Sequence, residues 1–316
     1  MKLLFFGLLL AGAGNVYAAE RPASLDWLEI VAFAGHQTDY SGVFVYQYDN
    51  RVETSHIIHV AAANGEYEKL ESLDGPQREI IRHAGQVWNF SNNRKTVQVD
   101  SQQGRSFPSL LPEQLSALSE NYQAKLLGVE RVAGYNVQAI LFQPKDNSRY
   151  IHKIWVHTDS GLLLKAAVLG DKNKLVEQYA FTQVQIGGKI DRSWVKEFDS
   201  VGAHNKPEIA RDIASTHSGW TVDTLPSGFK KTLEILRPMR GKDKLVTQMV
   251  YCDGLSAISI FIEPNDSDQD DVAGLSSRGA VNLYHKVVDR NLITVVGEVP
   301  ARTVMQVLDS VRYNGK

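Results

Sequence analysis

Cysteine is almost absent from this chain of 316 residues, in which Cys252 is the only one. A single thiol excludes an intrachain disulfide and any metal cluster held by several cysteines. Because Cys252 follows Val250 and Tyr251 in a strand-like run, we interpret it as a buried, unreactive thiol, with a reactive thiol as the alternative. Packing alone must therefore stabilise the fold, and the chain is long enough for two hydrophobic cores.

Sequence signatures of catalysis are also absent. The chain contains no G-x-S-x-G, P-loop, G-x-G-x-x-G or H-E-x-x-H motif. His56 and His59 are three residues apart, and His152 and His157 are five apart, so each pair would lie on opposite faces of a strand. We therefore predict no catalytic residue, no metal site and no cofactor, and a hydrolase of the cell envelope is the distant alternative.

Neither sign of charge dominates, because 34 basic residues face 36 acidic ones and the formal net charge is −2. A nucleic-acid-binding protein needs a concentrated basic surface, so this balance argues against one. Asp266, Asp268 and Asp270 have the spacing of the first ligands of a calcium loop. Asp271 and Ser277 replace the Gly and Glu that such a loop requires, so we interpret the run as a solvated acidic loop.

Positive charge is concentrated toward the C-terminal end, where six basic and two acidic residues lie between Lys230 and Lys244. Such a surface suits acidic segments of a protein partner or lipid phosphates, and an ordinary solvated rim is the alternative. The candidate partner-binding residues are Lys230, Lys231, Arg237, Arg240, Arg278, Lys286 and Arg290.

A marked apolar run occurs only at the N-terminus, where residues 1–18 have the pattern of a secretory signal peptide. Lys2 precedes an apolar run over residues 3–11, and the small residues Val16 and Ala18 precede the expected cleavage site. This run is shorter than the roughly 18 residues of a membrane-spanning helix, and no later segment is as apolar. We expect an exported protein, with an uncleaved N-terminal anchor as the alternative.

Residues 19–201 have the pattern of one large domain built on an antiparallel sheet. Strand-like runs separated by short turns predict roughly nine or more strands, and a sheet of that size must curl or close. The predicted strands are 43–48, 55–62, 66–73, 78–90, 95–100, 129–143, 149–158, 162–170 and 174–186.

Two helical segments interrupt this order of strands. The spacing of apolar residues predicts a helix from Ser24 to about Thr38 and another over Phe107–Leu127, where Pro112 suits the first turn. We expect both helices to cover the concave, apolar side of the curved sheet. The apolar face of the second helix would consist of Leu111, Leu115, Leu118 and Tyr122.

Residues 202–218 show little periodicity and form the predicted linker to a small α+β domain over residues 219–316. A stripe of valines and leucines predicts a final helix from about Pro300 to Val311. The predicted strands of this domain are 232–237, 244–252, 257–263, 280–288 and 291–298.

A curled sheet with an apolar inner face must fill that space with its own side chains or with a guest molecule. An open cavity and a closed, packed core use the same residue types, so both remain open. A buried acyl chain would contribute about 0.8 kcal/mol per CH₂ group, enough to bias a protein–protein equilibrium. The candidate lipid-cavity residues are Phe44, Tyr46, Trp88, Phe90, Phe142 and Trp155.

Six short motifs carry a resemblance that extends over essentially the whole chain after the predicted signal peptide. They are Leu73–Ile81 (LDGPQREII), Ser106–Leu110, Ile154–Thr158, Trp220 with Leu225–Phe229, Tyr251–Leu255 and Thr294–Pro300. In this order and spacing the chain resembles the RseB/MucB family of periplasmic regulators of the sigma-E envelope-stress response. His157 and Leu163 depart from the family pattern, which tends to have Asp and Pro there, and this difference concerns local turn geometry more than function.

The resemblance implies an α+β fold: a large curved antiparallel half-barrel sheet covered by helices, similar to the lipoprotein carrier LolA, followed by a small regulatory α+β domain. It also implies a periplasmic protein that binds the periplasmic part of a membrane anti-sigma factor and shields it from the first protease of the cascade. Binding of a lipid or lipopolysaccharide fragment would release this partner, with the two domains reorienting about the linker.

A periplasmic lipoprotein or lipid carrier with an accessory domain is the alternative function. Such a carrier would hand cargo to an outer-membrane acceptor, whereas a regulator would change sigma-E activity. Exposed strand edges of an open half-barrel could also pair between copies, so a homo-oligomer is a further open alternative.

Overall fold

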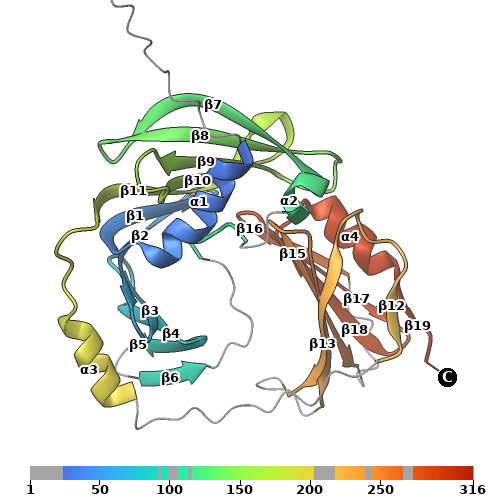
Figure 1. Cartoon of the computed structure of the whole chain (residues 1–316). Helices are drawn as coiled ribbons and strands as arrows, with labels where there is room; N and C mark the ends of the chain where they lie inside the picture. The colour runs from blue at the N-terminus through green and yellow to red at the C-terminus, as the bar shows by residue number, and fades with distance from the viewer. Residues whose placement is uncertain are drawn as a thin grey trace, which may run out of the picture.

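Eleven antiparallel strands form a single sheet in this computed structural model (Figure 1). The strand order β6-β5-β4-β3-β2-β1-β11-β10-β9-β8-β7 means that two meanders join where β1 pairs with β11. The described residues are 24–91, 94–98, 106–112, 116–202, 218–238, 244–265 and 273–315. The strands are β1 (Tyr40–Tyr48), β2 (Arg51–Ala62), β3 (Gly65–Ser72), β4 (Arg78–His83), β5 (Gln86–Ser91), β6 (Arg94–Gln98), β7 (Tyr122–Val132), β8 (Tyr135–Pro144), β9 (Ile151–His157), β10 (Leu163–Leu169) and β11 (Leu175–Ile186).

This sheet curves into a half-barrel but does not close, because β6 and β7 lie at opposite ends of the strand order. Helix α1 (Ser24–Gln37) lies on the concave side (Figure 1). Its residues Leu28 and Val31 are buried in the same core as Phe44 and Ile57. Removing such side chains from water stabilises the half-barrel by roughly 1.5–3 kcal/mol for each large apolar residue.

Helix α3 (Ser193–Gly202) covers the opposite, convex face of the half-barrel (Figure 1). Trp194 and Phe198 of this helix form a separate buried cluster with Tyr67 and Trp88 of the sheet. The ring centroids of Trp88 and Phe198 are 4.7 Å apart in an edge-to-face arrangement. The sequence pattern did not predict this helix, which ends where the predicted linker begins.

Described residues from 218 onward form a second unit, which we call the C-terminal domain. Its six-stranded antiparallel sheet has the order β13-β14-β15-β18-β17-β16. Helix α4 (Ala301–Asp309) packs on the face turned away from the half-barrel (Figure 1), where Val304, Val307 and Leu308 are buried. The strands are β12 (Trp220–Val222), β13 (Lys230–Arg237), β14 (Val246–Cys252), β15 (Ala257–Pro264), β16 (Gly274–Arg278), β17 (Val281–Val288), β18 (Asn291–Gly297) and β19 (Val311–Tyr313), and β12 pairs with β19.

The predicted fold class is confirmed: a large, open, curved antiparallel sheet with helices is followed by a small α+β domain. The predicted helix near Pro300 ends at Asp309, and Val311 begins a short strand. The pattern missed β12, β16 and β19. The predicted signal peptide and most of the predicted linker lie outside the described residues. In the part of the chain that the structure describes, no helix has the length and apolar character to cross a membrane.

Two predicted strands are in fact hairpins. The patterns over residues 78–90 and 129–143 predict one strand each, but each folds back on itself. The turns are Ala84-Gly85 and Ala133-Gly134, where all four residues have positive φ. Two consecutive positive φ angles are typical of the type I′ turns that match the twist of a hairpin. Asn-Gly or Asp-Gly usually marks these turns, so alanine at the first position concealed them.

The predicted helix over Phe107–Leu127 is wrong for much of its length. Helix α2 covers only Ser116–Asn121, and Tyr122 begins strand β7. Pairing of the first residues of β7 with β8 holds this segment extended. Local helical propensity is a weak preference that long-range pairing overrides. Leu115, part of the predicted apolar face, lies outside the described residues.

Candidate functional site

A cavity of about 770 Å³ lies between the concave face of the half-barrel and the C-terminal domain. Phe44, Phe142 and Ile154 line it from the half-barrel, and Leu233 and Val250 line it from the C-terminal domain. Natural small-molecule sites have volumes of roughly 300–1,000 Å³ and mostly apolar walls. The volume therefore suits a small guest molecule, and the lining is mostly apolar with the charged residues Arg82, Glu177 and Glu298 among it.

The segment that joins the two meanders contributes one part of this wall. Phe107, Leu110 and Leu111 line the cavity. The Phe107 ring stacks on the Tyr179 ring with centroids 5.5 Å apart and lies 5.1 Å from Phe44. This contact fixes a segment without regular secondary structure onto the sheet. Ser106–Leu110, one of the family-like motifs, is thus a structural part of the cavity.

Strand β14 contributes the opposite wall through the alternation of its side chains. Val250 and Cys252 line the cavity, whereas Met249 and Tyr251 are buried in the core beneath α4. Cys252 was predicted to be buried, but it is only half-buried in this wall, and it is not in a disulfide. Its Sγ lies 3.9 Å from the Thr232 hydroxyl.

The predicted lipid-cavity residues lie at different distances from the cavity. Phe44 and Phe142 line it. Tyr46 lies on the same face of β1 as Phe44 and beside the cavity, where its ring stacks on the lining residue Tyr179 with centroids 4.3 Å apart. The structure therefore brings three of the six aromatic residues to the same region.

The other three predicted cavity residues stabilise the sheet elsewhere. Trp88 and Phe90 pack against α3 on the convex face. Trp155 follows the lining residue Ile154 and so lies on the opposite face of β9. Its ring lies 4.4 Å from the Lys153 ammonium group, and its Nε1 donates to Glu130 at 2.7 Å. The alternation of side chains along a strand shows which residues share a face, but not which face becomes the concave side of the sheet.

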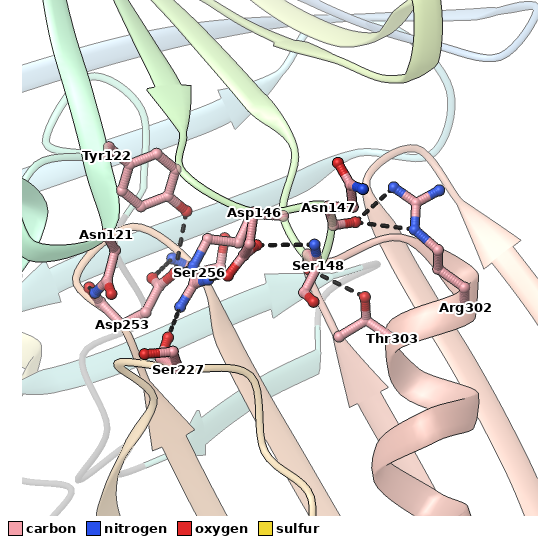
Figure 2. Close-up of polar contacts among 11 residues, drawn as sticks. Asn121, Tyr122, Asp146, Asn147, Ser148, Ser227, Asp253, Ser256, Arg302 and Thr303 are labelled. Carbon is pink, nitrogen blue, oxygen red and sulfur yellow. Dashed lines mark hydrogen bonds and ion pairs between the residues drawn. The ribbon is translucent and has the colours of Figure 1, made fainter.

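Asp253 connects the two domains beside the cavity (Figure 2). Its Oδ2 accepts hydrogen bonds from Arg149 Nε at 2.5 Å and from the Tyr122 hydroxyl at 3.0 Å. Its backbone carbonyl accepts a hydrogen bond from Asn121 Nδ2 at 3.0 Å. Arg149 also donates to the backbone carbonyl of Ser227. We call these five residues the Asp253 contact.

The Asp253 contact is a buried ion pair with satisfied hydrogen bonds. The side chains of Arg149 and Asp253 are 1% and 0% exposed. Burial lowers the pKa of Arg149, but the hydrogen bond and the charge of Asp253 more than offset this effect and raise the pKa above its usual value. Burial and the Asp253 charge raise the pKa of Tyr122, which therefore keeps its proton. Such a pair adds little net stability when complete, but loss of one partner leaves an unpaired buried charge.

A second contact joins the start of α4 to the turn between β8 and β9 (Figure 2). Arg302 Nε and Nη2 donate to the Asn147 carbonyl at 2.9 and 2.5 Å. The Thr303 hydroxyl donates to the Ser148 carbonyl at 3.0 Å. These bonds orient α4 relative to the half-barrel.

A third contact joins the turn between β16 and β17 to the half-barrel. Glu177 Oε2 accepts hydrogen bonds from the Ala280 backbone N–H and from the Tyr46 hydroxyl, both at 2.9 Å. Arg278 Nη2 donates to Glu53 Oε1 at 3.1 Å. Tyr46, predicted as a cavity residue, therefore acts mainly between the domains.

His152 is a half-buried titratable group in the cavity wall, and its Nε2 atom is shielded from solvent. Its ring lies edge-on to Tyr122, and among the described residues its Nε2 has no hydrogen-bond partner. Burial lowers the pKa of His152 to about 4, against a smaller opposing effect of the Asp253 charge. The imidazole is therefore neutral at neutral pH, which suits an apolar cavity.

The predicted basic partner-binding residues are spread over the C-terminal domain from β13 to the turn after β17. Two of them pair across the domain boundary, Lys230 with Glu120 at 3.4 Å and Arg278 with Glu53 at 3.1 Å. The others are Lys231 paired with Glu234, Arg237 bonded to Gln248, Lys286 paired with Asp309, and Arg290 in the turn after β17. Arg240 lies outside the described residues.

Three of the four histidines that stood out in the sequence, His56, His59 and His157, have polar partners nearby. His59 Nδ1 contacts the Thr38 carbonyl at 2.8 Å, and its Nε2 contacts Glu66 at 3.2 Å. His157 Nδ1 contacts the Ser160 hydroxyl at 2.8 Å. Among the residues that the structure describes, no three or more His, Cys, Asp or Glu side chains are placed to hold a metal ion.

Sequence reasoning did not identify the Asp253 contact, and it placed Tyr122 on the apolar face of a predicted helix. Asp253 and Ser227 lie in two of the family-like motifs, but a motif does not say what each residue touches. Arg149 follows a turn, and a basic side chain at such a position is usually exposed to solvent. The signal that the sequence offered was Asp253, an acidic residue directly after an apolar strand.

Comparison with known proteins assigns both parts of the chain to one family. Residues 23–198 match the MucB/RseB N-terminal domain, and residues 214–312 match the MucB/RseB C-terminal domain. The sigma factor AlgU regulatory protein MucB of Pseudomonas aeruginosa is 31% identical over 98% of this chain and 96% of its own length. The sigma-E factor regulatory protein RseB of Escherichia coli is 24% identical over 99% of both chains.

Solved structures agree with this assignment. The structure of MucB in complex with MucA(peri) matches with a TM-score of 0.72 and 26% identity, over 93% of this chain and 100% of that chain. The structure of the Pseudomonas aeruginosa MucA/MucB complex matches with a TM-score of 0.73 and 28% identity, over 92% of this chain and 99% of that chain. The half-barrel, the C-terminal domain and their order are thus those of known relatives, and the chain belongs to the MucB/RseB family.

Proposed function

We propose that this protein is a periplasmic regulator that binds the periplasmic part of a membrane anti-sigma factor and shields it from proteolysis, so that sigma-E-type activity stays low. The observation that carries this proposal is the match, over nearly the whole chain, to MucB solved in complex with MucA(peri). Relatives of similar length are named regulators of sigma factors. These relatives are named as regulators, which agrees with a protein that binds its partner without catalysing a reaction.

A lipid or lipopolysaccharide fragment would release the partner in this proposal. The apolar cavity of about 770 Å³ supports it, because its walls come from both domains. A guest that prefers one arrangement of the domains shifts the protein toward that arrangement, and a partner that prefers another is released. The Asp253 contact and the contacts of Glu177 and Arg302 are the bonds that such a rearrangement would change.

A pull-down with the periplasmic segment of the cognate anti-sigma factor tests the regulator directly. We expect association at micromolar concentration without added lipid. A segment that does not associate at this concentration would remove the proposal. Shielding is tested in the same mixture by adding the first protease of the cascade, which should cleave the segment more slowly when this protein is present.

The second candidate function, a lipoprotein or lipid carrier with an accessory domain, is favoured by the same apolar cavity. The two functions differ in their effect on the cell. Deletion of a regulator raises the sigma-E stress output, whereas deletion of a carrier leaves this output unchanged and impairs delivery of lipidated cargo. A reporter of sigma-E activity in a deletion strain therefore separates them.

A further inference from the structure

Strand β7 forms one open edge of the half-barrel and carries a bulge of apolar residues at its centre (Figure 1). The pairing of β7 with β8 shifts register between Leu126 and Val129, so Leu127 and Gly128 have no partner residue across the strand. Leu126 and Leu127 are each 37% exposed, and Val129 is 58% exposed. Nothing lies within 4 Å of a Cβ atom added at Gly128. Three large apolar side chains are therefore exposed together at the rim of the sheet.

Basic side chains lie beside this bulge on the convex face of the sheet. Lys153 precedes Ile154, which lines the concave side, so Lys153 lies on the convex side. Lys125 of β7 and Lys153 of β9 both pair with Leu141 of β8, and directly paired residues share a face. Because neighbouring strands are about 4.8 Å apart, the backbones of the two lysines are about 10 Å apart.

The balance of charge on this face is positive. Lys165 of β10 pairs with Trp155 and holds its ammonium group 4.6 Å from the centre of that ring. Strands β7–β11, which the structure describes in full, contain two acidic residues, Glu130 and Glu177. Glu130 pairs with Lys153 at 3.0 Å, whereas Glu177 lines the cavity on the other face. Three lysines therefore face one carboxylate here, in a chain whose formal net charge is −2.

We propose that the apolar bulge of β7 and the lysines beside it dock on the anionic surface of a phospholipid bilayer. This proposal goes beyond the regulatory function proposed above and does not depend on it. An exposed apolar patch with a polar rim is typical of interaction sites, and apolar side chains bind in the interfacial zone of a bilayer. Each lysine near an anionic bilayer raises the affinity about fivefold. Neither effect requires recognition of one particular lipid.

A second copy of this chain is the other occupant that an open strand edge could accept. The bulge disfavours this occupant, because a continuous ladder of hydrogen bonds cannot form across two residues that are out of register. Charge also disfavours it, since pairing of two β7 strands would bring the same lysines of both copies close together. An anionic bilayer needs no ladder and neutralises these charges.

Flotation with lipid vesicles tests this proposal on the exported protein, purified from the periplasm. Vesicles that contain phosphatidylglycerol are compared with vesicles of phosphatidylcholine that have the same acyl chains, so capture of a chain in the cavity contributes equally to both. We expect half-maximal binding to the anionic vesicles at a lipid concentration at least about tenfold lower. About 1 M salt should remove this preference, because it shortens the screening length from about 10 Å to about 3 Å.

Two pairs of matched variants locate the docking surface. Lys125→Gln should raise the lipid concentration of half-maximal binding about fivefold, whereas Lys286→Gln, at an exposed site of the C-terminal domain, should leave it unchanged. Leu127→Asp should raise this concentration at least about fivefold, because it replaces an apolar contact with a negative charge. Leu275→Asp places the same charge at an exposed position on β16 and should have no effect. If circular dichroism shows that Leu127→Asp does not fold, Val129→Asp tests the same bulge.

The outcomes separate the bilayer from other occupants and from the regulator. Anionic vesicles that bind no better than phosphatidylcholine overturn the proposal, and so does a folded Leu127→Asp protein that floats like the native chain. In gel filtration without vesicles, the native chain and Leu127→Asp should elute together. A native dimer that Leu127→Asp converts to a monomer would assign the bulge to a second copy and overturn the bilayer. Association with the anti-sigma segment is measured without vesicles, so none of these results bears on the regulator.

Discussion

Asp253 is a buried residue that accepts three of the described hydrogen bonds between the two domains. One carboxylate oxygen binds the turn of its own domain through Leu255 and Ser256, and the other binds Arg149 and Tyr122 of the half-barrel. All acceptor positions of a buried carboxylate are thus used, which is the condition under which burial of a charge is tolerated. The residue specifies one arrangement of the domains rather than adding much stability.

The first prediction concerns the Asp253→Asn substitution. It removes the buried partner of Arg149 Nε and leaves the guanidinium with only the partly exposed Asp146 as a counter-charge, so the loss should approach the about 3–5 kcal/mol of a broken buried ion pair. Chemical denaturation should show this loss. Asp309→Asn is the matched control, because Asp309 pairs with Lys286 at an exposed site, and such pairs contribute about 0–1 kcal/mol. Equal stability of the two variants would contradict our account of the Asp253 contact.

The second prediction concerns the pH dependence that His152 causes. Its folded pKa of about 4 lies below the usual value of 6.5, so the unfolded chain binds a proton more readily. The contribution is complete above pH 6.5 and is lost as the pH falls toward about 4. Between about pH 7 and about pH 5 the native chain should lose about 2 kcal/mol of unfolding free energy through this group. Urea denaturation of the native chain and of His152→Gln at both pH values measures it, and parallel losses in the two proteins would refute the assignment.

Individual site residues were the least predictable from sequence. Alternation placed Trp155 and Phe142 in strands, but only the curvature of the finished sheet decides that Phe142 lines the cavity and that Trp155 lies on the other face. Arg149 and Asp253 are 104 positions apart, and no local pattern connects them. Charge counting likewise could not show that Lys230 and Arg278 pair across the domain boundary.

At the scale of elements, turns explain where prediction succeeded and failed. Asn64-Gly65 was recognised as a turn, and β2 and β3 form the expected hairpin around it. Ala84-Gly85 and Ala133-Gly134 have positive φ angles at both positions without the usual Asn or Asp, so two hairpins were predicted as single strands. The strand at Tyr122 was predicted as helix because its pairing with β8 is not encoded locally.

The third prediction concerns the turn that contains Gly228. Its φ of +82° lies in the left-handed region, and an added Cβ would meet Asn121 Oδ1 at 1.8 Å. Gly75 also has a positive φ of +70°, but nothing lies within 4 Å of its Cβ position. Both Gly→Ala variants should lose about 1–2 kcal/mol to backbone strain. Gly228→Ala should lose about 1–3 kcal/mol more, because it overpacks against Asn121 of the Asp253 contact.

Thermal and urea denaturation of Gly228→Ala and Gly75→Ala measure this difference. Gly228→Ala should also raise the reactivity of Cys252, since displacement of Asn121 loosens the contact beside the cavity. If Gly75→Ala is as unstable as Gly228→Ala, the turn at Gly228 does not pack closely against Asn121 of the half-barrel.

At the scale of the whole molecule, hydrogen bonds of Asp253, Ala280, Thr303, Lys230 and Asn282 join the C-terminal domain to the half-barrel, and the cavity lies between the two domains. A guest in the cavity and a protein partner that prefers one arrangement of the domains would act on the same equilibrium. By linkage, a guest that lowers the affinity for the partner must have its own affinity lowered by the partner by the same factor. Such coupling energies are typically about 1–3 kcal/mol.

The central claim is that the contents of the cavity set the affinity for the anti-sigma segment. Fluorescence anisotropy of a labelled segment, titrated with this protein at rising palmitate concentrations, measures that affinity most directly. We predict micromolar or tighter binding without palmitate, and a Kd that rises about 5–150-fold to a plateau as the cavity fills. A Kd that stays constant over the whole range of palmitate concentrations would contradict the account.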